Sequence, residues 1–135
     1  MKIFAALFLV ATPMLAQYSV VWEHDLAAAQ KRAKAEKKML FVDVWAEWCG
    51  PCQYLKNKVF PTPEAQKALA AYIPVSLMTQ AKDGTPNPAN TKVAERFKVE
   101  AFPTMLILDA EGKEVRRQVG AFRTGTEFGA WLAAN

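Results

Sequence analysis

The stretch "FVDVWAEWCGPC", residues 41–52, decides the fold of this chain. It begins inside an apolar run over residues 39–45 that only Asp43 interrupts, a pattern typical of a strand buried on both faces. Pro51 follows shortly afterwards, and proline suits the first turn of a helix. The sequence therefore predicts a buried strand that leads directly into a helix, with Cys49 at the junction.

Cys49 and Cys52 are the only cysteines in the chain. A structural zinc site needs four Cys or His ligands, and His24 is the only histidine that could join them. A purely structural disulfide is the second alternative, but closing so short a loop removes little entropy from the unfolded chain. A redox pair explains the spacing better. A helix N-terminus favours the thiolate of Cys49, and Cys52 lies one turn away, within reach of a mixed disulfide on Cys49.

Asp43 is the one charged residue in the predicted buried strand. Burying an ionised carboxylate is costly, so we expect a raised pKa and a side chain able to exchange a proton. The alternative is a partly solvated carboxylate at a kink in the strand.

Hydrophobic periodicity and turn residues predict the remaining elements. Helices are expected over residues 25–37, from residue 50 onward, and over 63–72, 89–97 and 124–134; strands are expected over 39–45, 73–78, 104–109 and 113–120. The segment 79–92 is expected to be mostly loop. The first half alternates strands with helices, and the second half ends in a hairpin and a covering helix. This order predicts an α/β fold with a central mixed β-sheet flanked by helices.

The first residues, "MKIFAALFLVATPMLAQ" (1–17), have the pattern of a secretory signal peptide. Lys2 precedes an apolar run, Pro13 ends it, and Ala16 is a small residue suited to cleavage. We expect a signal peptide over residues 1–16, a single domain over 17–135, and a periplasmic or secreted location. An uncleaved membrane anchor is the alternative, although the apolar run is shorter than the ~20 residues of a spanning helix.

The composition is that of an ordinary globular domain, with 52% hydrophobic and 22% charged residues. The formal net charge of +4 is modest for 135 residues and does not indicate a nucleic-acid partner.

Three segments together resemble the thioredoxin family over roughly residues 25–135. They are "FVDVWAEWCGPC" (41–52), "AFPTMLILDAEGKEV" (101–115) and "VGAF" (119–122) with the helix that follows. The resemblance implies the thioredoxin fold and a thiol-disulfide oxidoreductase that needs neither a cofactor nor a metal.

The resemblance also implies roles for individual residues. Cys49 would attack the substrate disulfide, Cys52 would resolve the mixed disulfide, and Asp43 would accept the proton of the resolving thiol. Pro103 would be the cis-proline packed against the disulfide. The surface that meets the partner would include Trp48, Gly50, Pro51 and Phe102.

Two departures separate the chain from small cytosolic thioredoxins. The segment 79–92 is longer, and the lysine that those proteins place near the buried Asp has no counterpart around residues 75–78. With the signal peptide, these features are similar to exported members of the family, such as the periplasmic C-terminal domain of DsbD-type thiol-disulfide transporters.

We therefore expect an exported thiol-disulfide oxidoreductase that works mainly as a reductase, since the Gly-Pro between the cysteines resembles reducing members of the family. The expected partners are a membrane thiol-disulfide electron donor and protein disulfide substrates, either misoxidised secreted proteins or apocytochromes. A monomer is the simplest expectation. The alternatives are a disulfide oxidant or isomerase, and a binding module that keeps the fold without using its thiols.

Overall fold

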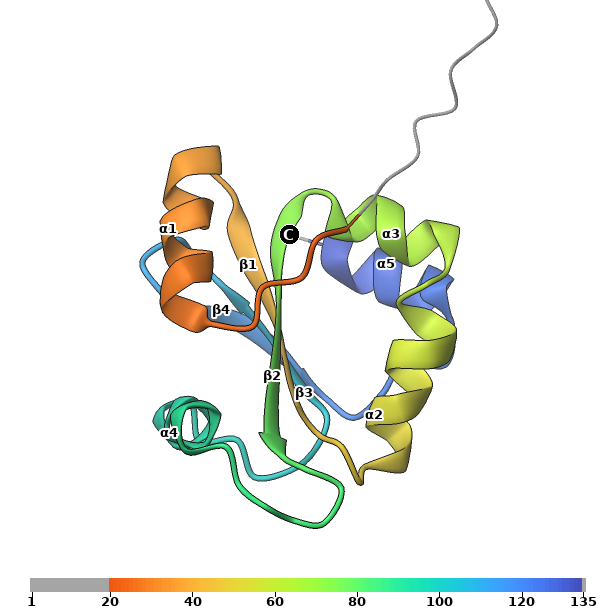
Figure 1. Ribbon diagram of the computed structural model, residues 1–135. Helices are drawn as coiled ribbons and strands as arrows, with labels where there is room; N and C mark the ends of the chain where they lie inside the picture. Colours follow the sequence, from red (N-terminus) through yellow and green to blue (C-terminus); the bar gives the residue numbers. More distant parts are fainter. Residues whose placement is uncertain (1–19, 135) are drawn as a thin grey trace, which may run out of the picture.

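A four-stranded sheet in the order β2-β1-β3-β4 forms the centre of the fold (Figure 1). The computed structural model describes residues 20–134, so the predicted signal peptide lies outside the described residues. The strands are β1 (Met39–Ala46), β2 (Tyr72–Gln80), β3 (Thr104–Leu108) and β4 (Glu114–Val119). β1 pairs in parallel with β2 and antiparallel with β3, and β3 pairs antiparallel with β4. The predicted mixed sheet is confirmed.

Helices cover both faces of the sheet (Figure 1). They are α1 (Leu26–Glu36), α2 (Gly50–Tyr54), the π-helical turn η1 (Leu55–Val59), α3 (Pro63–Leu69), α4 (Pro88–Arg96) and α5 (Gly125–Ala133). α1 and α4 pack on one face, and α2, η1, α3 and α5 lie on the other. The predicted order of helices and strands is therefore confirmed, except that the helix from residue 50 ends in a π-helical turn.

Short polar side chains set where the helices begin. Asp25 accepts a hydrogen bond from the backbone N–H of Ala28 at 2.7 Å, and Thr62, Asn87 and Thr124 cap α3, α4 and α5 in the same way. Proline occupies the first turn of α2, α3 and α4, where its missing N–H costs no hydrogen bond.

Strand β1 is buried on both faces, as its apolar run predicts. Leu40 and Val42 alternate with Phe41, so that the first two pack with α1 and α4 while Phe41 faces the opposite layer. Only the first residue, Met39, is exposed. The strand thus joins two separate hydrophobic cores.

The segment 79–92 is more ordered than the sequence predicts. β2 continues to Gln80, and α4 begins at Pro88, so the connection is reduced to residues 81–87. The strand continues because Gln80 still pairs with Ala46 at the end of β1, and the backbone N–H of Asn87 also donates to the carbonyl of Thr79 at 2.7 Å.

None of the helices within residues 20–134 combines the length and the apolar character needed to cross a membrane.

Replacing Phe41 by alanine is expected to lower the free energy of unfolding by about 3–5 kcal/mol. Phe41 is fully buried and its ring packs edge-on against Trp22, Phe60 and Phe128 at centroid distances of 5.2–6.0 Å. Chemical denaturation at neutral pH measures the loss. Val115→Ala, at a side chain that is 56% exposed, is the matched control and should change the stability by less than about 0.5 kcal/mol. Equal losses in the two variants would contradict this description of the core.

Candidate active site

The two cysteines lie where β1 leads into α2. Cys49 is the N-cap of α2, and its Sγ accepts a hydrogen bond from the backbone N–H of Cys52 at 3.3 Å. The structure joins Cys49 and Cys52 in a disulfide with a Cα–Cα distance of 5.2 Å. Both residues are buried, so the pair is covered on most sides by protein. The prediction that the cysteines lie at a strand-to-helix junction is confirmed.

An aromatic rim borders the disulfide. Trp48 is 52% exposed, and its ring meets that of Phe102 in a T-shaped contact with the centroids 6.0 Å apart. Phe102 also packs against the small cluster of Trp45, Ala46, Cys49 and Cys52. Residues that are distant in the sequence are therefore brought together, as the resemblance implied.

Pro103 follows Phe102 directly and is buried, and the peptide bond between them is cis. The carbonyl of Pro103 accepts a hydrogen bond from the backbone N–H of Gly120 at 2.9 Å. The predicted cis conformation of the Phe102–Pro103 peptide bond is thus confirmed. Gly50 and Pro51, between the cysteines, are both exposed.

Asp43 lies in the middle of β1, opposite Ser76 of β2 and Met105 of β3. It is only 4% exposed, and its buried Oδ1 has no hydrogen-bond partner in the structure. Burial raises the pKa of this carboxyl from 3.8 to about 7. The expectation of a buried carboxyl with a raised pKa is confirmed, and the alternative of a partly solvated side chain is wrong.

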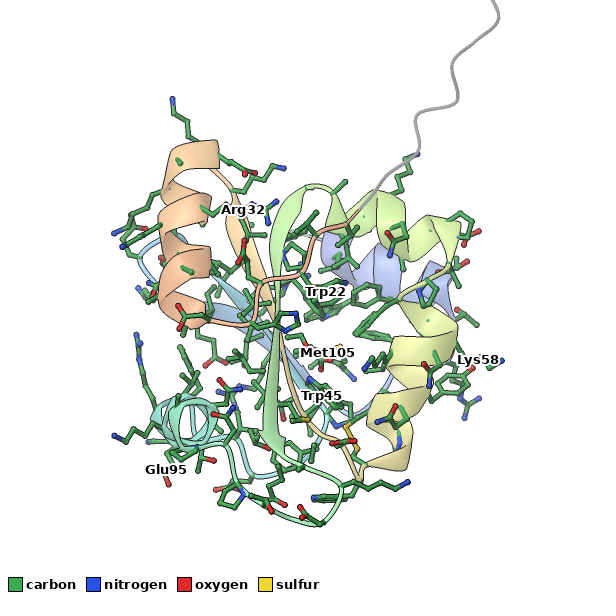
Figure 2. The ribbon with its side chains drawn as sticks, viewed as in Figure 1. Trp22, Arg32, Trp45, Lys58, Glu95 and Met105 are labelled. Atoms are coloured by element: carbon green, nitrogen blue, oxygen red, sulfur yellow. A yellow bond between two sulfur atoms is a disulfide. The ribbon has the colours of Figure 1, made fainter. Side chains whose placement is uncertain are left out.

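An open pocket of about 870 Å³ reaches Asp43 from the edge of the sheet. Its lining includes Trp45, Gln53, Lys56 and Ser76. The ammonium of Lys56 lies 5.0 Å from the centroid of the Trp45 ring. In Figure 2, Trp45 lies between the sheet and the helical layer, whereas Lys58 points outward. Lys56 of η1 thus brings a positive charge to this pocket, whereas β2 contains no lysine or arginine.

Sequence reasoning missed the hydrogen bonds that hold the turn between β1 and α2. The indole N–H of Trp48 donates to Gln80 Oε1 at 2.7 Å, and the side-chain amide of Gln53 donates to the carbonyl of Glu47 at 3.0 Å. No signal in the sequence could have found the first contact, because Gln80 belongs to a segment expected to be loop.

Within residues 20–134, no three His, Cys, Asp or Glu side chains are grouped so that they could hold a metal ion.

Comparison with known proteins gives a consistent result. The family model described as "Thioredoxin-like domain" matches residues 26–135. The chain is 31% identical over 123 residues to the thiol:disulfide interchange protein DsbD of Haemophilus ducreyi, covering 90% of this chain and 20% of that protein. It is 45% identical over 83 residues to the thioredoxin of Chlamydia muridarum, covering 61% of this chain and 69% of that protein.

The structure also resembles the C-terminal domain of Neisseria meningitidis DsbD in its oxidised form, with a TM-score of 0.61. That match covers 78% of this chain and 87% of the domain, at 17% identity, and it therefore bears on the fold alone. The chain spans about one fifth of the length of the full DsbD relative.

These findings, together with the disulfide at the strand-to-helix junction, show to which protein family the chain belongs. The chain belongs to the thioredoxin-like family and is a thiol-disulfide oxidoreductase of that family.

Replacing Asp43 by asparagine is expected to change how stability depends on pH. The folded protein holds a proton on Asp43 up to about pH 7, whereas the unfolded chain releases it near pH 3.8. The free energy of unfolding of the wild type should therefore fall as the pH rises through this interval, by up to about 4 kcal/mol. Asp43→Asn should remove that fall and be the more stable protein at pH 8.

Denaturation of the oxidised protein between pH 4 and pH 8 measures the effect, because the cysteines do not titrate while they form a disulfide. Asp83→Asn is the matched control: Asp83 is exposed, and its hydrogen bonds with Thr85 lower its pKa. Parallel curves for the wild type and Asp43→Asn would show that Asp43 does not titrate in this range.

Proposed function

We propose that this protein is an exported thiol-disulfide oxidoreductase that reduces protein disulfides. The observation that carries the proposal is the position of Cys49 at the start of α2, where its sulfur already accepts a hydrogen bond from Cys52. The same hydrogen bond and the helix N-terminus would stabilise a thiolate on Cys49 in the reduced protein. The attacking sulfur is thereby favoured in its nucleophilic form.

The proposed reaction starts from the reduced dithiol. The thiolate of Cys49 attacks one sulfur of the substrate disulfide, so that an S–S bond to Cys49 forms and the other substrate sulfur leaves as a thiolate. Cys52 then loses its proton and attacks Cys49 Sγ. This step forms the Cys49–Cys52 disulfide and releases the second substrate sulfur. Two electrons pass from the dithiol to the substrate, and both substrate sulfurs end as thiols after protonation.

Asp43 is the proposed acceptor of the proton from Cys52. Its carboxyl has a pKa of about 7, so both the protonated and the ionised forms are populated near neutral pH. A group that is partly ionised at the working pH can both take up and release a proton during one cycle. The pocket that reaches Asp43 supplies a route by which solvent can exchange that proton.

The proposed surface for the partner includes Trp48, Gly50, Pro51 and Phe102, all of which are exposed or partly exposed around the disulfide. Pro103 is proposed to support this surface from below, next to the disulfide. An apolar rim suits the polypeptide around a substrate cystine, because it removes apolar surface from water when the two proteins meet.

Three observations support the reducing direction and the exported location. The dipeptide between the cysteines, Gly50-Pro51, resembles reducing members of the family, residues 1–16 have the pattern of a signal peptide, and DsbD is among the relatives. Each turnover oxidises the dithiol, so we propose that a membrane thiol-disulfide protein returns the electrons. Misoxidised exported proteins or apocytochromes are the proposed substrates, and a mature domain over residues 17–135 is the proposed acting form.

Cys52→Ser is expected to accumulate mixed disulfides through Cys49, because the resolving sulfur is missing and the first intermediate persists. The measurement is non-reducing electrophoresis of the affinity-purified variant from its native cell envelope, followed by release with dithiothreitol. Cys49→Ser is the matched control and should trap far less, since it lacks the attacking sulfur.

Equal trapping by the two variants would contradict these roles. A Cys49→Ser, Cys52→Ser double variant that fully rescues a deletion strain would instead favour a binding module that does not use its thiols.

A further inference from the structure

The end of β2 contains a β-bulge next to the active site. Trp45 pairs with Met78, but the next residue, Ala46, pairs with Gln80, so Thr79 is an extra residue in β2. Thr79 is buried, and its hydroxyl donates to the backbone carbonyl of Trp45 at 3.0 Å. This hydrogen bond gives the Trp45 carbonyl a partner at the bulge. A bulge of this kind changes the direction of the side chains that follow it. Here it brings Gln80 level with the end of β1.

Gln80 contacts the active-site turn through both its backbone and its side chain. Its carbonyl accepts the backbone N–H of Glu47 at 2.9 Å, and its Oε1 accepts the indole N–H of Trp48 at 2.7 Å. Phe102 meets the Trp48 ring in the T-shaped contact at 6.0 Å. The indole is therefore held by two different elements, although about half of its surface stays exposed.

The connection that follows Gln80 is bound to the same turn. The backbone N–H of Lys82 donates to Glu47 Oε2 at 3.2 Å, and that of Ala81 donates to the carbonyl of Thr85 at 2.8 Å. A bridge between Gln80 and Pro86 brings the connection back along the strand end. Residues 81–87 thus form an ordered extension of the active-site rim, in the segment that makes this chain longer than small thioredoxins.

We propose that Gln80 is a positioning residue that holds the Trp48 indole ready for contact with protein substrates. The inference rests on the proposed function and deepens it. A half-exposed indole that is already fixed loses little conformational freedom when a partner docks, so the contact is worth more than one made by a mobile side chain. The substrate class favoured in this way is a protein disulfide flanked by polypeptide that can cover the indole. A small disulfide reaches Cys49 without needing that surface.

The experiment compares Gln80→Ala with the wild type on two substrates, insulin as a protein disulfide and hydroxyethyl disulfide as a small one, with dithiothreitol as the reductant. Loss of one positioning hydrogen bond should raise KM for insulin about three- to tenfold and leave kcat within about twofold. The rate with hydroxyethyl disulfide should not change. Gln80→Glu keeps an oxygen that can accept the indole N–H and should restore most of the insulin KM.

Gln118→Ala is the matched control. Gln118 lies on β4, and its side-chain amide donates to the neighbouring carbonyl of Val119 at 3.2 Å rather than to the active-site turn. This variant should behave as the wild type on both substrates.

A second measurement follows the indole N–H of Trp48 directly by NMR, with its resonance assigned from Trp48→Phe. In Gln80→Ala this proton should exchange with solvent faster than in the wild type, while the other indoles remain unchanged. An unchanged insulin KM together with unchanged indole exchange would overturn the proposal. So would equal losses on both substrates, since these would mean that Gln80 acts on the disulfide itself. A wild-type protein that reduces neither substrate would instead contradict the proposed function.

Discussion

The burial of β1 between β2 and β3 is the constraint on which the rest of the structure depends. The strand lies at the centre of the sheet and joins the two hydrophobic cores through its alternating side chains. Because it cannot shift along its neighbours without exposing one of these faces, its end is fixed in space. Cys49 lies three residues after the last residue of β1, Ala46, and is the N-cap of α2. The packing of the strand therefore fixes the position of the Cys49 sulfur.

The same burial gives Asp43 its chemistry. A carboxyl on a solvated strand would be ionised at neutral pH, whereas here desolvation brings its pKa to about 7. The ionised carboxylate is therefore less favourable in the folded protein than in the unfolded chain. As a result, the free energy of unfolding falls as the pH rises from 3.8 to about 7. This cost to stability fits the proposed role of Asp43 as the proton acceptor for Cys52, because perturbed pKa values cluster at functional sites.

Much of this arrangement could be predicted from the sequence because its signals are local. The apolar run of β1, the proline of α2 and the cysteine spacing each depend on a few neighbouring residues, and they sufficed to predict the fold class and the position of the cysteine pair. The contacts around Gln80 could not be predicted in this way. They depend on a bulge at Thr79 that sequence periodicity does not show, and on a hydrogen bond between residues 32 positions apart. The pocket beside Asp43 was missed for the same reason, since Lys56 reaches it from a different element.

The Cys49–Cys52 pair is proposed to work as a reductant, and its reduction potential tests this role most directly. The purified protein would be equilibrated in graded thiol-disulfide redox buffers, and the fraction of reduced protein would be read by alkylation of the free thiols. We expect a potential near that of thioredoxin, about −270 mV. A value near about −120 mV, at the oxidising end of the family, would contradict the account and make disulfide formation the function of the pair.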